Sequence, residues 1–85
     1  MSTSLFTKAN ELLVEAIVEA RRSKGVRQVD LAQRLGKNQS YISNIERGQR
    51  RLDIVEFYAL ASALDCDPVE LFRIATLHFP ADIEI

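Results

Sequence analysis

The 85-residue sequence has one cysteine, one histidine and no tryptophan. The single cysteine, Cys66, cannot form an internal disulfide, so nothing in the chain points to an oxidising compartment. No apolar run approaches the ~20 residues of a membrane-spanning helix. The apolar N-terminal stretch contains acidic residues and lacks a small-residue cleavage site, unlike a signal peptide. We therefore expect a cytoplasmic protein.

The same scarcity argues against an enzyme. Cys66 and the only histidine, His78, lie in segments away from any acidic pair. No spacing of His, Cys, Asp and Glu fits a metal site, and no glycine-rich loop fits a phosphate. Core packing is the simpler role for Cys66, and a contact with a helix dipole is the simpler role for His78. We predict no catalytic residue, no cofactor and no metal ion.

Length and composition fit one small domain over residues 1–85, and a 47% hydrophobic fraction is enough for a packed core. Apolar residues recur with helical spacing, and no segment has a clear strand pattern. The sequence therefore predicts an all-α fold of five helices. They are expected from Ser4 or Thr7 to Lys24, Gln28 to Leu35, Gln39 to about Arg47, Asp53 to about Leu64 and Asp67 to about His78.

Capping signals mark three helix starts: Asn38, Asp53 in a capping box with Glu56, and Asp67 before a proline. Gly36 is expected to take a positive φ in the turn before the third helix. The apolar stripes of the helices are expected to form the core. They contain Leu5, Ala9, Leu12, Leu13, Ala16, Ile17, Ala20, Leu31, Ala32, Leu35, Ile42, Ile45, Ile54, Phe57, Leu60, Ala61 and Leu64.

The net charge is −1, but the two signs are segregated along the chain. Residues 21–51 hold nine Lys or Arg against two acids, a net charge of +7. Residues 53–85 hold one Arg against seven acids, a net charge of −6. Ordinary solvated charge would mix the signs, and attraction to phosphate depends on the local patch. We expect the basic segment to face a polyanion and the acidic half to lie on the far side.

The stretch from Gln28 to Arg50 is the most informative part of the sequence. It reads QVDLAQRLGKNQSYISNIERGQR, which is two short helices joined by a tight turn, with Gln, Ser and Asn on the second helix beside several Arg. It resembles the XRE-type, or phage-repressor, helix-turn-helix family in the pattern QxxLAxxxGxxxxxISxIExGxR. The resemblance covers about residues 15–73. It implies a lambda-repressor-like DNA-binding domain whose second motif helix enters the major groove.

Four side chains near the start of the third helix are the expected base readers. The resemblance implies this role for Gln39, Ser40 and Asn44, which face outward by helical spacing. The Gln39 amide can donate and accept together, which matches N6 and N7 of adenine. Tyr41 is expected to pack on a thymine methyl group or to reach a phosphate through its hydroxyl. A solvated polar side chain is the plain alternative for each residue.

Phosphate contacts are expected around the base readers, where they set register without reading sequence. Gln28 begins the second helix, whose N-terminus favours an anion, and the resemblance implies a bond from its amide to a phosphate. The other expected contacts are Lys37, Asn38, Ser43, Arg47, Gln49, Arg50 and Arg51. Generic surface charge is the alternative, above all for Arg51.

Glu46 is an acid within a basic cluster, so we expect it to serve structure. The resemblance implies a partly buried salt bridge between Glu46 and Arg21 of the first helix. Arg27 stands where the family usually has a Ser or Thr cap, so the start of the second helix is expected to be less well satisfied. Asp65 stands where the family often has Gly, and Asp tolerates the left-handed conformation better than most residues.

Both ends of the chain extend beyond the resemblance and carry apolar residues. These are Leu5 and Phe6 at one end, and Leu77, Phe79, Ile83 and Ile85 at the other. They cover the core or form a subunit interface, and the sequence leaves both possibilities open.

Double-stranded DNA is the expected partner, bound by a homodimer on a pseudo-palindromic operator with recognition helices about 34 Å apart. The sequence does not separate a repressor from an activator. The competing hypothesis is an antitoxin or adaptor module whose main role is to bind a protein partner through the acidic half.

Overall fold

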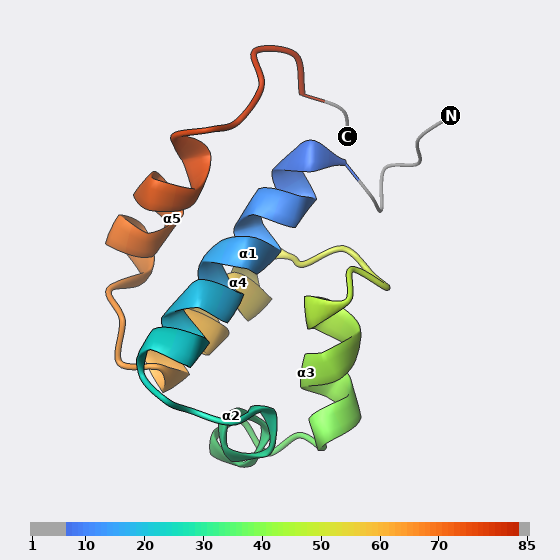
Figure 1. Ribbon diagram of the computed structural model, residues 1–85, viewed down its shortest axis with the longest axis vertical. Coiled ribbons are helices and arrows are strands. Elements are labelled where there is room, and N and C mark those ends of the chain that lie inside the picture. Colours follow the sequence, from blue (N-terminus) through green and yellow to red (C-terminus); the bar gives the residue numbers. More distant parts are fainter. Residues whose placement is uncertain (1–6, 84–85) are drawn as a thin grey trace.

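The computed structural model describes residues 7–83, which form five α-helices (Figure 1). They are α1 Lys8–Ser23, α2 Gln28–Arg34, α3 Gln39–Glu46, α4 Ile54–Ala63 and α5 Pro68–Thr76. No strand occurs between residues 7 and 83, and the predicted all-α fold is confirmed. The predicted helix ends agree within two residues, except that the possible start at Ser4 lies outside the described residues. None of these helices is long and apolar enough to cross a bilayer.

Four helices begin at a capping side chain. Thr7, Asn38, Asp53 and Asp67 each accept a backbone N–H from the first turn of α1, α3, α4 and α5, over distances of 3.3, 3.1, 2.7 and 3.0 Å. These oxygens satisfy donors that have no partner within the helix. The caps predicted at Asn38, Asp53 and Asp67 are confirmed.

The start of α2 is held differently. Arg27 occupies the N-cap position and makes no capping hydrogen bond through its side chain, as expected from its lack of an acceptor. Instead, the Asp30 carboxylate accepts the Arg27 backbone N–H at 3.4 Å and its guanidinium Nε at 3.0 Å. An acid inside the first turn therefore stabilises this helix start in place of a Ser or Thr before it.

Helix α1 is the central element of the bundle (Figure 1). It packs against α5 on one side, against α3 on the other and against α4 behind it, and α2 packs mainly against α3. The largest fully buried side chains come from α1 to α4 and from the residue that follows α4: Ile17, Leu31, Ile42, Ile45, Phe57, Leu60 and Leu64. Phe57 of α4 meets Phe72 of α5 edge to face, with ring centroids 5.8 Å apart. This shared core fixes the position of α2 and α3.

The structure corrects the predicted core in α4. Ile54 was expected to be buried and is 64% exposed. Helix α4 is apolar on most of its circumference, so periodicity alone does not reveal which side faces inward. Val14, Val26 and Leu52 are buried although the predicted stripes omit them, and Leu5 lies outside the described residues.

Two turn residues have the left-handed conformation that the sequence predicts. Gly36, between α2 and α3, has φ +67°, and Asp65, after α4, has φ +58°. Glycine has no Cβ to resist this conformation, and Asp resists it less than most residues. The turn at Gly36 sets the angle at which α3 leaves α2.

Two basic side chains fasten the carbonyl end of α4. Arg34 of α2 donates to the Ala63 carbonyl at 2.8 Å, and Lys24 donates to the Asp65 carbonyl at 3.1 Å. Cations near a helix C-terminus satisfy free carbonyls and complement the helix dipole. Part of the basic segment therefore holds α2 and the end of α1 against α4.

Candidate nucleic-acid interface

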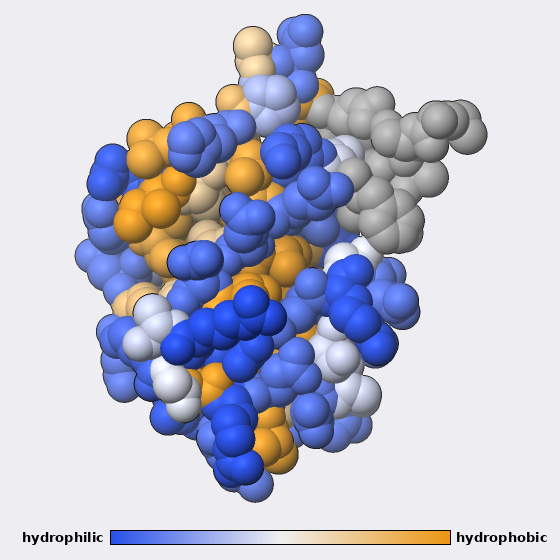
Figure 2. Space-filling model, viewed as in Figure 1, coloured by the Kyte–Doolittle hydropathy of each residue, from blue (hydrophilic) through white to orange (hydrophobic). Residues whose placement is uncertain are grey.

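Helix α3 turns a polar side outward and an apolar side inward. Ile42 and Ile45 are buried, whereas Gln39, Ser40 and Arg47 are exposed. Ser43 and Asn44 are half-buried on the same outward side. Hydrophilic side chains cover most of the visible surface over α2 and α3, and hydrophobic ones gather over the groove between α1 and α5 (Figure 2). A polar helix side of this kind suits the major groove, which is wide enough for an α-helix.

A chain of hydrogen bonds runs from α1 through α3 and α2 to the exposed start of α3. Arg21 Nε lies 2.6 Å and its Nη2 3.0 Å from the Glu46 carboxylate. Gln28 Nε2 donates to Glu46 Oε1 at 2.8 Å, and Gln39 Nε2 donates to Gln28 Oε1 at 3.2 Å. Four side chains that lie far apart in the sequence are thus brought into one connected row.

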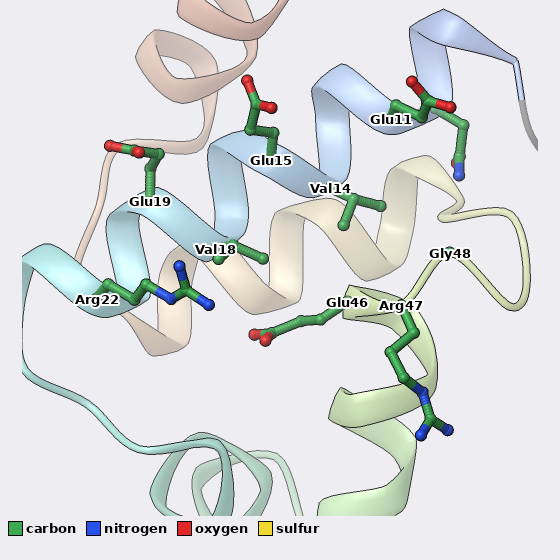
Figure 3. Close-up of a pocket in the computed structure, with 10 residues that line it drawn as sticks. Glu11, Val14, Glu15, Val18, Glu19, Arg22, Glu46, Arg47 and Gly48 are labelled. Atoms are coloured by element: carbon green, nitrogen blue, oxygen red, sulfur yellow. The ribbon is translucent and has the colours of Figure 1, made fainter.

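The Arg21–Glu46 salt bridge is the buried anchor of this row. The two side chains are 10% and 8% exposed, and Arg21 Nη1 also donates to the Val26 carbonyl at 2.8 Å. Glu46 projects from the end of α3 toward α1 (Figure 3). The predicted pairing is confirmed, and it ties α1 to α3 and to the segment before α2.

Asn44 and Asn38 also have oriented amides. Arg47 Nη2 donates to Asn44 Oδ1 at 2.7 Å, and the Arg47 side chain runs back along α3 rather than toward α1 (Figure 3). Ser40 Oγ donates to Asn38 Oδ1 at 2.6 Å, the oxygen that also caps α3. In both residues the amide oxygen has a protein partner and the NH₂ group is directed elsewhere.

Tyr41 differs from the other three expected base readers. Its hydroxyl donates to Glu56 Oε2 of α4 at 2.8 Å, and its ring is half-buried. Two cations lie over the ring, with Lys37 Nζ 5.1 Å and the Arg50 guanidinium 5.3 Å from its centroid. Tyr41 therefore holds two expected phosphate-binding side chains beside α3, with its hydroxyl engaged within the protein.

Glu56 is the acid that the charge pattern did not lead us to expect here. It comes from the acidic half, yet it pairs with Arg50 and Tyr41 at the edge of the basic surface. The prediction that the acidic half lies entirely on the far side is wrong for this residue. Its place in the capping box of α4 was a visible signal, but that pattern describes a cap and says nothing of a contact with α3.

Burial and hydrogen bonding act in opposite directions on this cluster. Burial raises the pKa of Glu56, but hydrogen bonds from the Asp53 backbone, Tyr41 and Arg50 outweigh it and hold the pKa below its ordinary value. For Tyr41, burial first and the hydrogen bond to Glu56 second raise the pKa above its ordinary value. The cluster is therefore built around an ionised carboxylate and a neutral phenol.

Glu56→Gln should lower the free energy of unfolding by about 1 kcal/mol at pH 7, because the amide keeps an acceptor but loses the charge. A depressed pKa gives stability that is present above the unfolded-state value of 4.5 and is lost as the pH falls through the folded-state value. Urea unfolding of both proteins from pH 7 to pH 3 should show their stabilities converging. Glu70→Gln, at an exposed ion pair, is the control and should give a smaller difference. A constant gap at every pH would contradict this role.

The remaining expected phosphate contacts surround α3. Lys37, Gln49 and Arg51 are exposed, and Ser43 is half-buried. Arg50 is partly exposed beside its ion pair with Glu56. Ser43 lies on α3 itself, and the other four residues lie within five positions of its ends, whereas the Tyr41 hydroxyl is bonded to Glu56.

A groove beside α3 has a different character. A cavity of ≈ 500 Å³ between α1 and the end of α3 is lined by Asn10, Glu11, Val14, Glu15, Val18, Glu19, Arg22, Glu46, Arg47 and Gly48. Its three α1 glutamates, Glu11, Glu15 and Glu19, lie in a row along the side of α1 that is turned away from α3 (Figure 3). Like charges repel phosphate, so this row marks a limit of the surface suited to nucleic acid.

Comparison with known proteins assigns the family. The helix-turn-helix family model matches residues 17–71, more than half of the chain. A Sinorhizobium fredii protein named as an uncharacterized HTH-type transcriptional regulator, y4dJ, is 43% identical over 51 residues. That match covers 60% of this chain and 66% of the relative, so the chain spans just under two thirds of the relative's length.

Solved structures agree with this assignment. An XRE-family like protein from Pseudomonas syringae pv. tomato gives a TM-score of 0.78 at 35% identity, covering 85% of this chain and 88% of that one. The restriction-modification controller protein C.AhdI from Aeromonas hydrophila gives 0.62 at 41% identity, covering 69% and 86%. The clp gene regulator ClgR from C. glutamicum, at 23% identity and a TM-score of 0.75, shares the fold. This chain belongs to the XRE-type helix-turn-helix family.

Proposed function

We propose that this protein is a DNA-binding transcriptional regulator that lays α3 in the major groove of double-stranded DNA. The observation that carries the proposal is the hydrogen-bonded row that ends at Gln39, because it fixes a polar side chain at the exposed start of α3. In a helix-turn-helix, the N-terminal residues of the second helix contact base edges. The relative named as an HTH-type transcriptional regulator supports the same function.

Gln39 is the principal base reader in this proposal. Glu46 is a carboxylate and has no donor, so Gln28 must turn its NH₂ group toward Glu46 and its oxygen toward Gln39. Gln39 then donates one amide N–H to Gln28, and its oxygen and its other N–H remain available to DNA. An acceptor and a donor side by side match N6 and N7 of adenine. Ser40 and Asn44 are the other base readers.

Phosphate binding surrounds this centre. Lys37 and Arg50 both contact the Tyr41 ring, and we assign Tyr41 the role of positioning them in place of base reading. Gln28 keeps one amide N–H beyond its bond to Glu46, and Asn38 keeps its NH₂ group. The other phosphate contacts that we propose are Ser43, Arg47, Gln49 and Arg51. These contacts set register and affinity.

We further propose that the protein binds a pseudo-palindromic operator as a homodimer. An apolar face formed by Ile54, Val55, Tyr58, Val69 and Phe72 of α4 and α5 is exposed to solvent. Four of these residues line a cavity of ≈ 250 Å³ with Phe57 and Pro68, and no charged residue lines it. Contiguous exposed apolar faces of this kind mark interaction sites, and a two-fold dimer uses the same patch on both subunits. Two subunits also double the few contacts that one α3 offers.

The residues at the two chain ends, which the sequence offers as core cover or as a subunit interface, are arranged differently. Leu77 and Ile83 are exposed, so they do not cover the core, and Phe79 is half-buried. Leu5, Phe6 and Ile85 lie outside the described residues. The α4–α5 face groups more large apolar side chains than the described part of the tail does, and we favour it as the interface.

Gln39→Ala tests the reading function. It should lower the preference for the base that Gln39 contacts by roughly 1–3 kcal/mol while leaving the fold intact, because Gln39 is exposed. The measurement is a selection of bound sequences from a random duplex pool, followed by binding curves on single-base variants. Gln33→Ala, an exposed glutamine of α2 outside the proposed contacts, is the matched control and should preserve every base preference. An equal loss on all duplexes would show that Gln39 contacts only the backbone.

A further inference from the structure

A single hydrogen bond from Arg47 fixes the amide orientation of Asn44, one of the proposed base readers. Arg47 Nη2 donates to Asn44 Oδ1 over 2.7 Å, one turn along α3. A guanidinium has five N–H donors and no acceptor, so only the oxygen of the Asn44 amide can face it. Rotating that amide by half a turn would bring its NH₂ group against a cation that cannot accept a hydrogen bond. The Arg47 charge therefore fixes which end of the amide is available to a ligand.

From this geometry we propose that Asn44 reads DNA as a donor only, and that Arg47 positions it to do so. The proposal rests on the proposed DNA-binding function. An asparagine that recognises adenine needs its oxygen and its NH₂ group together at the base edge. With the oxygen turned toward the Arg47 guanidinium and one of its lone pairs engaged there, Asn44 presents its N–H donors on the opposite side of the amide. It favours a base whose major-groove edge carries acceptors, guanine through O6 and N7 or thymine through O4, over adenine, which pairs its N7 acceptor with an N6 amino group that donates.

Gln39, on the same helix, keeps its amide oxygen available as an acceptor, because contacts within the protein orient its amide differently. Its orientation is set by Glu46 through Gln28, and Glu46 accepts hydrogen bonds and donates none. Gln39 therefore loses one donor and keeps its oxygen, whereas Asn44 gives its oxygen to Arg47 and keeps its donors. Two amides of nearly the same chemistry thus read different bases, because Glu46 orients Gln39 through Gln28 and Arg47 orients Asn44 directly.

Arg47 consequently has two roles. Its Nη2 orients Asn44, and its other N–H groups remain directed along the exposed side of α3, where a phosphate contact is proposed. This revises the expectation that Arg47 contributes to affinity alone. Loss of Arg47 should change which base is preferred as well as how tightly all duplexes bind.

The test is a selection of bound sequences from a random duplex pool with the full chain and four variants. Asn44→Ala identifies the base position that Asn44 reads, because the preference there disappears. At that position the unchanged protein should prefer guanine or thymine over adenine by about tenfold. Arg47→Met, which keeps the aliphatic stem, should let the amide rotate and raise the share of adenine about tenfold. Arg47→Lys restores a donor and should restore the original preference.

Arg50→Met is the control, since it also removes one positive charge but does not contact Asn44. It should weaken binding to all duplexes and leave the base preference unchanged. Adenine preferred by the unchanged protein at the Asn44 position, no position affected by Asn44→Ala, or an Arg47→Met motif identical to the original would each overturn this inference alone. No enriched sequence for the unchanged protein would overturn the proposed DNA reading itself.

Discussion

Glu46→Ala is expected to destabilise the fold by about 3–5 kcal/mol, because it leaves the Arg21 guanidinium buried without its counter-charge. Folded domains have free energies of unfolding of roughly 5–15 kcal/mol, so a loss of this size removes much of the stability of a small domain. The same change removes the acceptor of Gln28 and breaks the row that ends at Gln39. Urea unfolding and DNA-binding measurements on the variant should both show large losses.

Two further variants separate stability from binding. Glu70→Ala removes the acid of an exposed ion pair with Arg73, and it should have little effect on either measurement. The pair Arg21→Met with Glu46→Leu replaces both buried charges by apolar side chains of similar size, which is often neutral or stabilising. This double variant should recover stability but should not recover base preference, because Gln28 still lacks its acceptor. Stability retained in Glu46→Ala alone would contradict the buried anchor.

Val69→Asp is expected to dissociate the homodimer and to weaken operator binding by about 100-fold or more. Val69 is 79% exposed on the apolar α4–α5 face, so the change should not disturb the core of the subunit. A carboxylate placed in a two-fold interface meets its own copy or loses solvent without a partner. Loss of the second site then removes the gain in affinity from linking two sites. Sedimentation and binding curves measure the two effects.

Leu77→Asp is the matched control for this experiment. Leu77 is 63% exposed in the segment after α5, which the sequence offers as the alternative interface. It should leave the dimer intact if the α4–α5 face is the interface. Dissociation by Leu77→Asp and not by Val69→Asp would assign the interface to the tail. A monomer at high concentration before any substitution would contradict the homodimer and leave the apolar face to a different protein partner.

Much of the fold could be predicted because local signals and periodicity agree along most of the chain. The caps at Asn38, Asp53 and Asp67 and the positive φ of Gly36 and Asp65 are local properties of one to four residues. Each depends on a side-chain oxygen or a tolerated φ that the residue type itself supplies. The family resemblance added the Arg21–Glu46 pair, which joins residues too distant for any local signal.

Periodicity could not place two other side chains. Ile54 lies on a helix that is apolar on nearly all sides, because one side of α4 packs in the core and another forms part of the exposed apolar face. Asn10 is a buried polar residue, and its oxygen accepts the Leu52 backbone N–H at 2.9 Å across 42 positions. Periodicity assigns such an asparagine to solvent, since the group that satisfies it is remote in sequence.

In the candidate site, too, features set by helical spacing could be predicted, whereas those set by tertiary packing could not. The outward placement of Gln39, Ser40 and Asn44 follows from helical spacing. Arg47 and Asn44 are three positions apart, so helical spacing could also have predicted their contact. The inward turn of Tyr41 toward Glu56 depends on how α4 packs beside α3, and that packing is a property of the whole core.

The most direct measurement of the central claim is a crystal structure of the protein bound to a duplex selected from a random pool. The account predicts that α3 lies in the major groove, with the Gln39 amide within hydrogen-bonding distance of a base edge and still bonded to Gln28. It also predicts Lys37 and Arg50 beside the flanking phosphates. A complex in which DNA contacts another surface, or in which α3 is covered by protein and reaches no base, would contradict it.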